Sequence, residues 1–250
     1  MYESSFTPLR EFVFLEKSES TNNDIKLKIR QSAEPVFAVI SAKEQSGGRG
    51  RLGRSFFSPS GGLYFSISFP LSGEEKNIPF FTLLAGLSVS LAIEQLTGVR
   101  TLIKWPNDIY YNDKKLGGIL CELVSGKTLT AAAGIGINLS LEKEDIPEEL
   151  TSVMTSFCAE GLSPPKTDEL IRKITDILDT FIYEQKQLFS VSPEIIGAIR
   201  SRSYSIGKKV KYETEDGVIS GTVTNINTNG AAEITLPDGT KREIFCGEII

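Results

Sequence analysis

The side chains best suited to chemistry lie in a stretch rich in glycine and arginine, residues 45–54. It carries Arg49, Arg51 and Arg54 within six residues, in a chain whose formal net charge is -5. Glycine lets backbone N–H groups close on an anion, and a guanidinium group binds phosphate or carboxylate through two hydrogen bonds. The stretch therefore predicts an anion-binding loop. A solvated connector between strands is the alternative interpretation.

Two familiar nucleotide motifs almost fit this loop, but neither one explains it. Residues 48–53 match GxGxxG, and residues 48–55 come close to a Walker A loop. In both motifs a helix follows the glycines and points its N-terminus at the phosphate. Here residues 56–62 lead into a predicted strand, and Arg54 stands where Walker A requires lysine. The loop must bind its anion in another way.

A second candidate segment is Lys104-Trp-Pro-Asn-Asp108, followed by Lys115 and a glycine pair. Proline stiffens the turn that would hold Asn107 and Asp108. Gly118 leaves the predicted strand bare, so that a ligand can approach it closely. Lys115 could then meet a carboxylate or phosphate, and an ordinary surface lysine is the alternative.

A third segment, Gly134-Ile-Gly-Ile-Asn138, repeats this pattern of glycines along an apolar strand. The strand ends at an amide side chain. The segment predicts either a second close approach of a ligand or a close contact between strand and helix.

The composition excludes several classes of enzyme. Histidine is absent, which removes Ser-His-Asp and Cys-His catalysis and the usual zinc hydrolase sites. An acidic chain with a pI near 5.1 is a poor general nucleic-acid binder. The cysteines Cys121, Cys158 and Cys246 are widely spaced, which indicates reduced thiols and no metal ligands. We see no signal peptide and no apolar run of membrane-spanning length, and we expect a cytoplasmic protein that contacts no membrane.

The periodicity predicts an α+β fold, with a mixed β-sheet packed against helices over residues 1–202. From residue 203 to 250 the pattern changes to short strands separated by turn signals at 215–217, 229–230 and 238–239, which predicts a small all-β barrel. In the first part we expect strands at residues 12–15, 36–40, 63–69, 101–104, 116–124 and 129–139, and helices at residues 22–30, 78–96, 170–182 and 193–200. Between the strands at 101–104 and 116–124 we expect a polar turn at Asn112-Asp113.

Taken in order, these segments resemble the signature blocks of the biotin–protein ligase family. Ser20-Thr21-Asn22 resembles the opening of that family's biotin pocket, and the motifs together span about residues 10–140. The resemblance implies a class II synthetase-like catalytic domain followed by an SH3-like barrel. The blocks that carry it are 48–54, 58–64, 104–108, 115–122 and 134–138.

The resemblance also implies a role for each matching residue. Lys115, Arg51 and Asp108 would be catalytic, with Lys115 bridging the biotin carboxylate and the α-phosphate. Biotin would contact Ser20, Thr21, Asn22, Gln45, Arg49, Gly50, Arg51, Lys115 and Gly118. The nucleotide would contact Arg49, Arg51, Arg54, Phe56, Asn107, Lys115 and Asn138.

The activity implied is activation of biotin by ATP, with Mg²⁺, to biotinyl-5′-AMP and pyrophosphate. The biotinyl group would then pass to a lysine of a biotin carboxyl carrier protein of acetyl-CoA carboxylase or a similar enzyme. About ten residues precede the first predicted strand, so we expect no winged helix and no DNA binding. Phe56 stands where the family usually has tryptophan, which reduces the stacking area. A homodimer is left open.

Three other hypotheses about the function compete with biotin–protein ligation. A lipoate–protein ligase would have a similar fold, but its glycine-rich motif includes a histidine, which this chain lacks. A sensor that binds biotin or its adenylate without chemistry would keep Lys115, Arg51 and Asp108 too. A β-barrel interaction protein would account only for residues 203–250.

Overall fold

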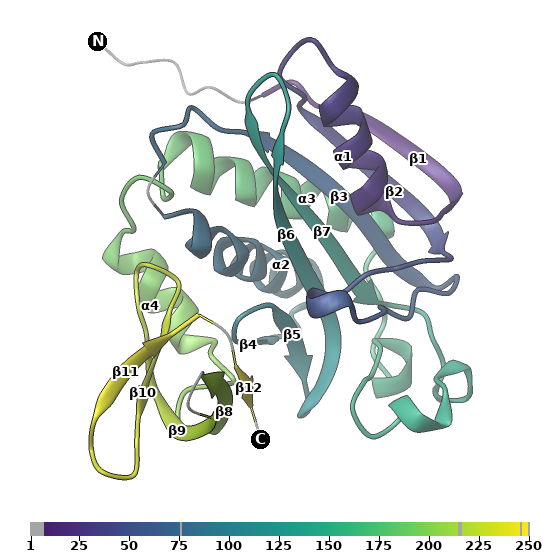
Figure 1. The fold of residues 1–250 in the computed structure, drawn as a ribbon. Helices are drawn as coiled ribbons and strands as arrows, with labels where there is room; N and C mark the ends of the chain where they lie inside the picture. The colour runs from purple at the N-terminus through teal and green to yellow at the C-terminus, as the bar shows by residue number, and fades with distance from the viewer. Residues whose placement is uncertain (1–7, 76, 215–216, 246, 250) are drawn as a thin grey trace.

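The computed structural model describes residues 8–75, 77–214, 217–245 and 247–249. A seven-stranded sheet in the order β1-β2-β3-β7-β6-β5-β4 forms the centre of the molecule (Figure 1). β1 and β2 are parallel and the other neighbours are antiparallel, which confirms the predicted mixed sheet. The strands are β1 Glu11–Ser18, β2 Ala38–Gln45, β3 Gly62–Pro70, β4 Leu102–Lys104, β5 Asp108–Tyr111, β6 Lys114–Ser125 and β7 Leu129–Asn138.

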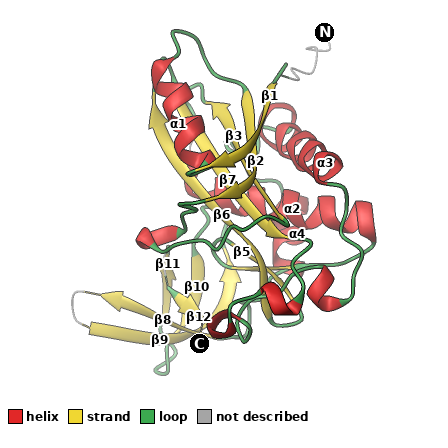
Figure 2. Cartoon of the chain, turned by 90° about the vertical axis from the view of Figure 1, so that its right-hand side faces the viewer, coloured by secondary structure: helices red, strands yellow, loops and turns green. Residues whose placement is uncertain are grey.

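Helices cover both faces of this sheet, α1 on one and α2 with α3 on the other (Figure 2). Alternation along β7 explains the two faces, since successive side chains of a strand point to opposite sides. Ala131 and Ala133 join the large core with α2 and α3, whereas Ala132 packs in a smaller core with α1. The helices are α1 Thr21–Gln31, α2 Phe81–Thr97, α3 Thr167–Asp179 and α4 Pro193–Ser201. Shorter turns of helix lie at Arg51–Gly53, Ile78–Phe80, Lys143–Asp145, Glu148–Leu150, Cys158–Glu160 and Thr180–Glu184.

The helix predicted at residues 78–96 is present, but our statement that no apolar run reaches membrane-spanning length is wrong. Among the described residues one helical stretch, Ile78–Thr97, is long and apolar enough, with a mean hydropathy of 1.5. About 67% of that stretch is buried inside the protein. Its apolar side chains belong to the core between α3 and the sheet, so the molecule itself covers most of this surface.

One strand of the sheet was missed by the sequence analysis. Residues 108–111 form β5, which pairs with β4 on one side and β6 on the other. The polar pair Asn112 and Asp113 was correctly predicted as a turn, and both residues have positive φ, of 46° and 61°. Two positive φ angles in a two-residue connection match the twist of a hairpin. The turn therefore joins β5 to β6.

The C-terminal strands form a separate antiparallel sheet in the order β11-β10-β9-β8-β12. Trp105 of the body donates through its indole Nε1 to the carbonyl of Gly230 at 3.0 Å and through its backbone N–H to Ser205 Oγ at 2.9 Å. These strands are β8 Lys209–Thr214, β9 Gly217–Ile226, β10 Ala232–Thr235, β11 Lys241–Ile244 and β12 Glu248–Ile249. An SH3-like barrel and a domain boundary at residue 203 stay predictions. Part of the expected turn at 215–217, and Cys246, lie outside the described residues.

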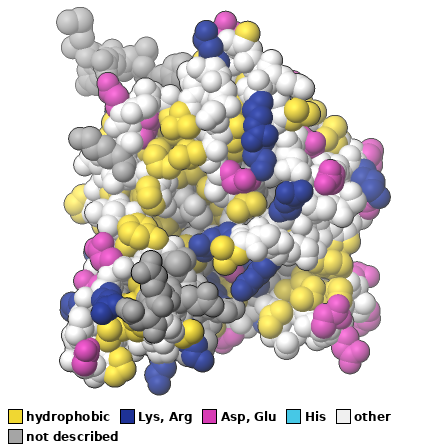
Figure 3. Space-filling view, in the orientation of Figure 1, with side chains coloured by type: hydrophobic (Ala, Val, Ile, Leu, Met, Phe, Trp, Pro, Cys, Tyr) yellow, Lys and Arg dark blue, Asp and Glu magenta, His cyan; other side chains and the backbone are white. Residues whose placement is uncertain are grey.

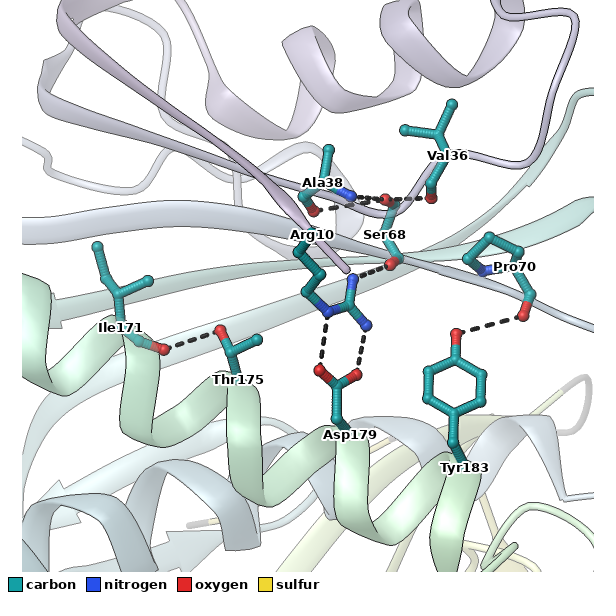
Figure 4. Close-up of polar contacts among 9 residues, drawn as sticks. All are labelled: Arg10, Val36, Ala38, Ser68, Pro70, Ile171, Thr175, Asp179 and Tyr183. Atoms are coloured by element: carbon teal, nitrogen blue, oxygen red, sulfur yellow. Dashed lines mark hydrogen bonds and ion pairs between the residues drawn. The ribbon is translucent and has the colours of Figure 1, made fainter. Parts of the chain in front are cut away.

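A buried ion pair joins the start of β1 to α3 (Figure 4). Arg10 forms an ion pair with Asp179 and donates to the carbonyl of Ser68 at 2.7 Å. Its guanidinium carbon lies 4.5 Å from the centroid of the Phe69 ring. Burial raises the pKa of the Asp179 carboxyl, and the Arg10 guanidinium opposes that shift. The pair fixes the N-terminal edge of the sheet to a helix that is distant in sequence.

Candidate active site

A cavity of about 760 Å³ opens between the glycine-rich strands, the arginine loop and the C-terminal sheet. Its volume is in the range of small-molecule sites, roughly 300–1,000 Å³. All fourteen residues predicted for the site line it: Ser20, Thr21, Asn22, Gln45, Arg49, Gly50, Arg51, Arg54, Phe56, Asn107, Asp108, Lys115, Gly118 and Asn138.

One face of β7 forms the floor of this cavity. Gly134, Gly136 and Asn138 lie two residues apart and therefore on the same side of the strand. A Cβ at Gly134 would lie 3.1 Å from Asn22 Oδ1, and one at Gly136 would lie 2.5 Å from Cε1 of Phe56. The glycines thus make room for the side chains that stand over the strand. At about 3.3 Å per residue, the floor is roughly 13 Å long from Gly134 to Asn138.

A β-bulge places Lys115 above the middle of the floor. The register between β5 and β6 shifts there, so that Tyr110 pairs with Lys115 while Asp108 pairs with Gly118. An irregularity of this kind redirects a side chain, and Lys115 reaches the same face as Gly118, three residues further on. Its ammonium Nζ lies 2.8 Å from Asp108 Oδ1. Gly118 in turn pairs with Gly136, which places this ion pair beside Phe56.

The arginine loop is a small hairpin. Arg49 and Ser55 form an antiparallel bridge, and the Gly50 N–H donates to the carbonyl of Arg54 at 2.7 Å. At its tip Leu52 has a φ of 56°, a conformation that favours glycine over leucine. Arg51 donates from Nη1 to Asn107 Oδ1 at 3.3 Å, which links the hairpin to the segment before β5. The short helical turn of the hairpin lies in front of the lower ends of β6 and β7 (Figure 1).

Ser20 and Thr21 lie at one wall of the cavity, where α1 begins at Thr21. Ser20 is the N-cap by backbone conformation, although its side chain makes no capping bond. The backbone N–H of Thr21 donates to Gln45 Oε1 at 2.9 Å, and Gln45 Nε2 donates to Ser58 Oγ at 3.1 Å. Ser58 donates to the carbonyl of Phe56 at 2.8 Å. This chain of bonds connects the start of α1 to the residue that covers the floor.

Asn22 and Asn138 are buried amides among the residues that line the cavity. Asn22 donates from Nδ2 to Glu122 Oε2 at 2.6 Å, and Asn138 donates from Nδ2 to the carbonyl of Thr155 at 2.8 Å. The Oδ1 atoms of both have no hydrogen-bond partner within the described part of the chain. A buried acceptor without a donor is costly, so both positions favour a ligand that supplies N–H or O–H groups.

Several residues that line the cavity were not predicted from the sequence, among them Trp105, Tyr110, Lys104 and Lys211. Lys104 donates from Nζ to the Tyr110 hydroxyl at 3.0 Å. Burial, followed by the nearby Asp108 charge, raises the pKa of Tyr110 to about 12, so that it stays a neutral phenol. Lys104 belongs to the motif Lys104-Trp-Pro-Asn-Asp108, so the sequence offered a signal that it lies near the site. Lys211 reaches the cavity only through the docking of the C-terminal sheet, which no local pattern predicts.

The cavity lining is strongly basic. Among the described residues that line the cavity, Asp108 is the acidic one. Six lining residues are basic: Arg49, Arg51, Arg54, Lys104, Lys115 and Lys211. Lys and Arg side chains gather in the middle of the corresponding face in Figure 3. This excess of positive charge, inside an acidic protein, indicates a polyanionic ligand.

Comparisons with known proteins agree with this geometry. The model of the biotin/lipoate A/B protein ligase family matches residues 14–139. The bifunctional ligase/repressor BirA of Bacillus spizizenii is 30% identical over 221 residues, which cover 86% of this chain and 66% of that protein, just under two thirds of its length. The biotin–[acetyl-CoA-carboxylase] ligase of Mycobacterium tuberculosis is 25% identical, over 88% of this chain and 82% of that protein.

A solved structure extends the likeness to nearly the whole chain. The biotin protein ligase of Aquifex aeolicus, in complex with biotin and ATP, superposes with a TM-score of 0.79 and 31% identity. The match covers 96% of this chain and 97% of that one. With the matched family model and the cavity described above, the resemblance predicted from the motifs is confirmed: the chain belongs to the biotin/lipoate A/B protein ligase family.

Proposed function

We propose that this protein is a biotin–protein ligase, which forms biotinyl-5′-AMP from biotin and ATP and then biotinylates a lysine of an acceptor protein. The observation that carries the proposal is the order of groups along the floor. Asn22 stands at the Gly134 end, the Lys115–Asp108 pair at Gly136, and Asn138 at the far end. A biotinyl-adenylate has the same order: a ring with N–H donors, a central phosphate and a nucleoside.

The first step joins two anions, so its barrier is largely electrostatic. A carboxylate oxygen of biotin attacks the α-phosphorus, and the bond to the bridging oxygen breaks as pyrophosphate leaves. Lys115 lies over the middle of the floor, and Arg51, which donates from the hairpin to Asn107, lines the same cavity. Both stabilise the charge that develops on the phosphoryl oxygens. No histidine base is needed, because the attacking carboxylate is already ionised.

In the second step the acceptor lysine attacks the carbonyl carbon of the mixed anhydride. The carbon–oxygen bond to the phosphate breaks and AMP leaves with the electron pair. The attacking amine must lose a proton, and Asp108 is the carboxylate we assign as its acceptor. The ion pair with Lys115 holds the Asp108 carboxylate over the middle of the floor, where the anhydride would lie.

Mg²⁺ belongs to this proposal as a companion of the nucleotide. The described residues contain no cluster of three or more His, Cys, Asp or Glu side chains that would form a metal site. The cavity's carboxylate, Asp108, is already paired with Lys115. The described residues therefore offer no such ligand set for Mg²⁺, which usually binds through substrate phosphates.

The acceptor we propose is a biotin carboxyl carrier protein of acetyl-CoA carboxylase or a related enzyme. The relative from Mycobacterium tuberculosis supports this choice by its name. A cytoplasmic location stays a prediction of the sequence, and a homodimer stays open.

The test is direct. The protein is incubated with ATP, Mg²⁺ and an apo carrier domain, with biotin in one reaction and lipoate in another, and the carrier is weighed by mass spectrometry. We expect a mass increase of one biotinyl group and no lipoyl addition. Lipoyl addition alone would support the rival ligase, and binding of biotin without any transfer would support the sensor.

A further inference from the structure

We infer that Glu122 and Lys26 are positioning residues that set the orientation of the Asn22 amide, and so make the cavity selective for a cyclic urea. This inference rests on the proposed function and deepens it. Neither side chain lines the cavity itself. Glu122 lies on β6 opposite Ala132, and Lys26 lies on α1 four residues after Asn22.

The contacts among the three side chains are tight. Asn22 Nδ2 donates to Glu122 Oε2 at 2.6 Å. Lys26 Nζ donates to the two oxygens of the same carboxylate at 3.0 and 2.9 Å. The side chain of Lys26 is only 15% exposed, and Asn22 is 5% exposed. Residues four apart on a helix share a face, so α1 presents Asn22 and Lys26 to Glu122 together.

This arrangement permits only one orientation of the amide. An amide can rotate by half a turn and exchange its oxygen for its nitrogen, and the two orientations have nearly the same shape. A carboxylate only accepts hydrogen bonds, so the nitrogen must face Glu122. Lys26 holds that carboxylate in place through hydrogen bonds to both of its oxygens. Asn22 Oδ1 therefore faces away from Glu122, toward Gly134, where it has no partner among the described residues.

The fixed oxygen selects the chemistry of the ligand. It accepts a hydrogen bond from an N–H group and repels a carbonyl oxygen or any other acceptor. A cyclic urea such as that of biotin carries two N–H donors, whereas the dithiolane ring of lipoate carries none. A site that must bond a donor rejects analogues without one, because its buried acceptor is then left unsatisfied. Asn22, Glu122 and Lys26 therefore contribute together to discrimination between biotin and lipoate.

The experiment measures binding of biotin alone, without ATP, by isothermal titration. Glu122→Met removes the acceptor and releases the Asn22 amide, and we expect biotin affinity to fall at least tenfold. Glu122→Gln keeps an acceptor oxygen for Asn22 Nδ2, and we expect its affinity within threefold of wild type. Lys28→Met is the matched control, since Lys28 lies on the same helix and pairs with Glu11 at 2.9 Å outside the cavity. It should leave biotin affinity unchanged.

A double variant shows whether Glu122 acts through Asn22. Glu122→Met should cost nothing further in an Asn22→Ala background. If the same loss recurs in that background, or if Glu122→Met binds biotin as wild type does, the inference is wrong. Thermal melts of every variant confirm that each is folded, and Lys26→Met should lower affinity in the same direction as Glu122→Met. A wild-type protein that binds lipoate and not biotin would instead overturn the proposed function.

Discussion

Lys115 is held over the centre of the cavity by its ion pair with Asp108 at 2.8 Å. Because its charge acts on the developing phosphoryl oxygens, we expect Lys115→Gln to lower kcat/KM for adenylate formation by about 10²–10³-fold, the usual cost of one oriented donor. The measurement is pyrophosphate release at saturating ATP. Lys114→Gln is the control: this neighbour donates to the Thr151 carbonyl at 2.7 Å and does not line the cavity. Equal losses in both variants would contradict the assignment.

Gly136 is the residue whose lack of a side chain matters most to the floor. In Gly136→Ala the added Cβ would lie 2.5 Å from Cε1 of the Phe56 ring, so the side chain of Phe56 would have to shift. We expect the ring to be displaced and affinity for a non-hydrolysable biotinyl-adenylate to fall at least tenfold, with little change in Tm, because the ring can move into the cavity. Calorimetry and a thermal melt separate these two effects. Unchanged affinity would show that Phe56 does not cover the ligand.

At the residue scale the sequence predicted more than at any other. The fourteen predicted residues lie together because the motifs carry both the glycines of the floor and the polar groups above it. The motifs did not reveal how the groups are oriented. The bulge that turns Lys115 to the cavity depends on pairing with β5, and the fixed amide of Asn22 depends on Glu122 from another strand.

The hairpin formed by residues 49–55 is the element best placed to retain the intermediate. Arg51 ties it to Asn107 at 3.3 Å, and Arg49 only approaches Glu19, at 4.0 Å. We expect Arg51→Ala to release biotinyl-5′-AMP into solution about ten times faster, because one charged bond to a part-buried partner is lost. The measurement is the dissociation rate of labelled adenylate after a chase with unlabelled biotin and ATP. Arg49→Ala should have a smaller effect, and full retention of the adenylate in the Arg51 variant would contradict this role.

The bounds of the helices were predicted closely, and those of the strands less closely. The helix at Pro193–Ser201 was correct to within a residue, and Ser192 caps it by accepting from Ile195 at 3.3 Å. The strand expected at residues 36–40 is observed at Ala38–Gln45, because pairing with β1 and β3 continues past the apolar run into polar residues. The four-residue strand β5 begins at Asp108 and has no apolar alternation of its own. Its neighbours in the sheet define it.

At the scale of the whole molecule, contacts between distant segments complete the site. Trp105 bonds to Gly230 and Ser205, and this docking brings Lys211 and Tyr212 of β8 to the rim of the cavity. The sequence predicted a small β domain at this place but not its contact with the motif around Trp105. Such contacts depend on the shapes of two folded parts, which periodicity does not encode.

The Arg10–Asp179 ion pair is another contact between distant segments, and its contribution to the free energy of unfolding can be measured. Each charge is buried, with side-chain exposures of 2% and 8%. Removing one partner leaves the other charge unpaired, so we expect Arg10→Met and Asp179→Leu each to cost about 3–5 kcal/mol of unfolding free energy. The double variant should cost far less than the sum, because two apolar side chains can fill the site without desolvating a charge. Urea unfolding of the four proteins at pH 7 measures this coupling.

The pH dependence of the unfolding free energies of wild type and the double variant shows whether the Arg10–Asp179 pair is a net source of stability. Burial raises the pKa of Asp179 in the folded state above its value of 3.8 in the unfolded chain. The folded state therefore binds this proton more tightly, and the contribution of the group to stability is present below pH 3.8 and declines as the pH rises through the folded pKa. The double variant has no such group, so its stability relative to wild type should increase between about pH 4 and pH 7. If it instead decreases over that range, Arg10 outweighs burial and the pair is a net source of stability.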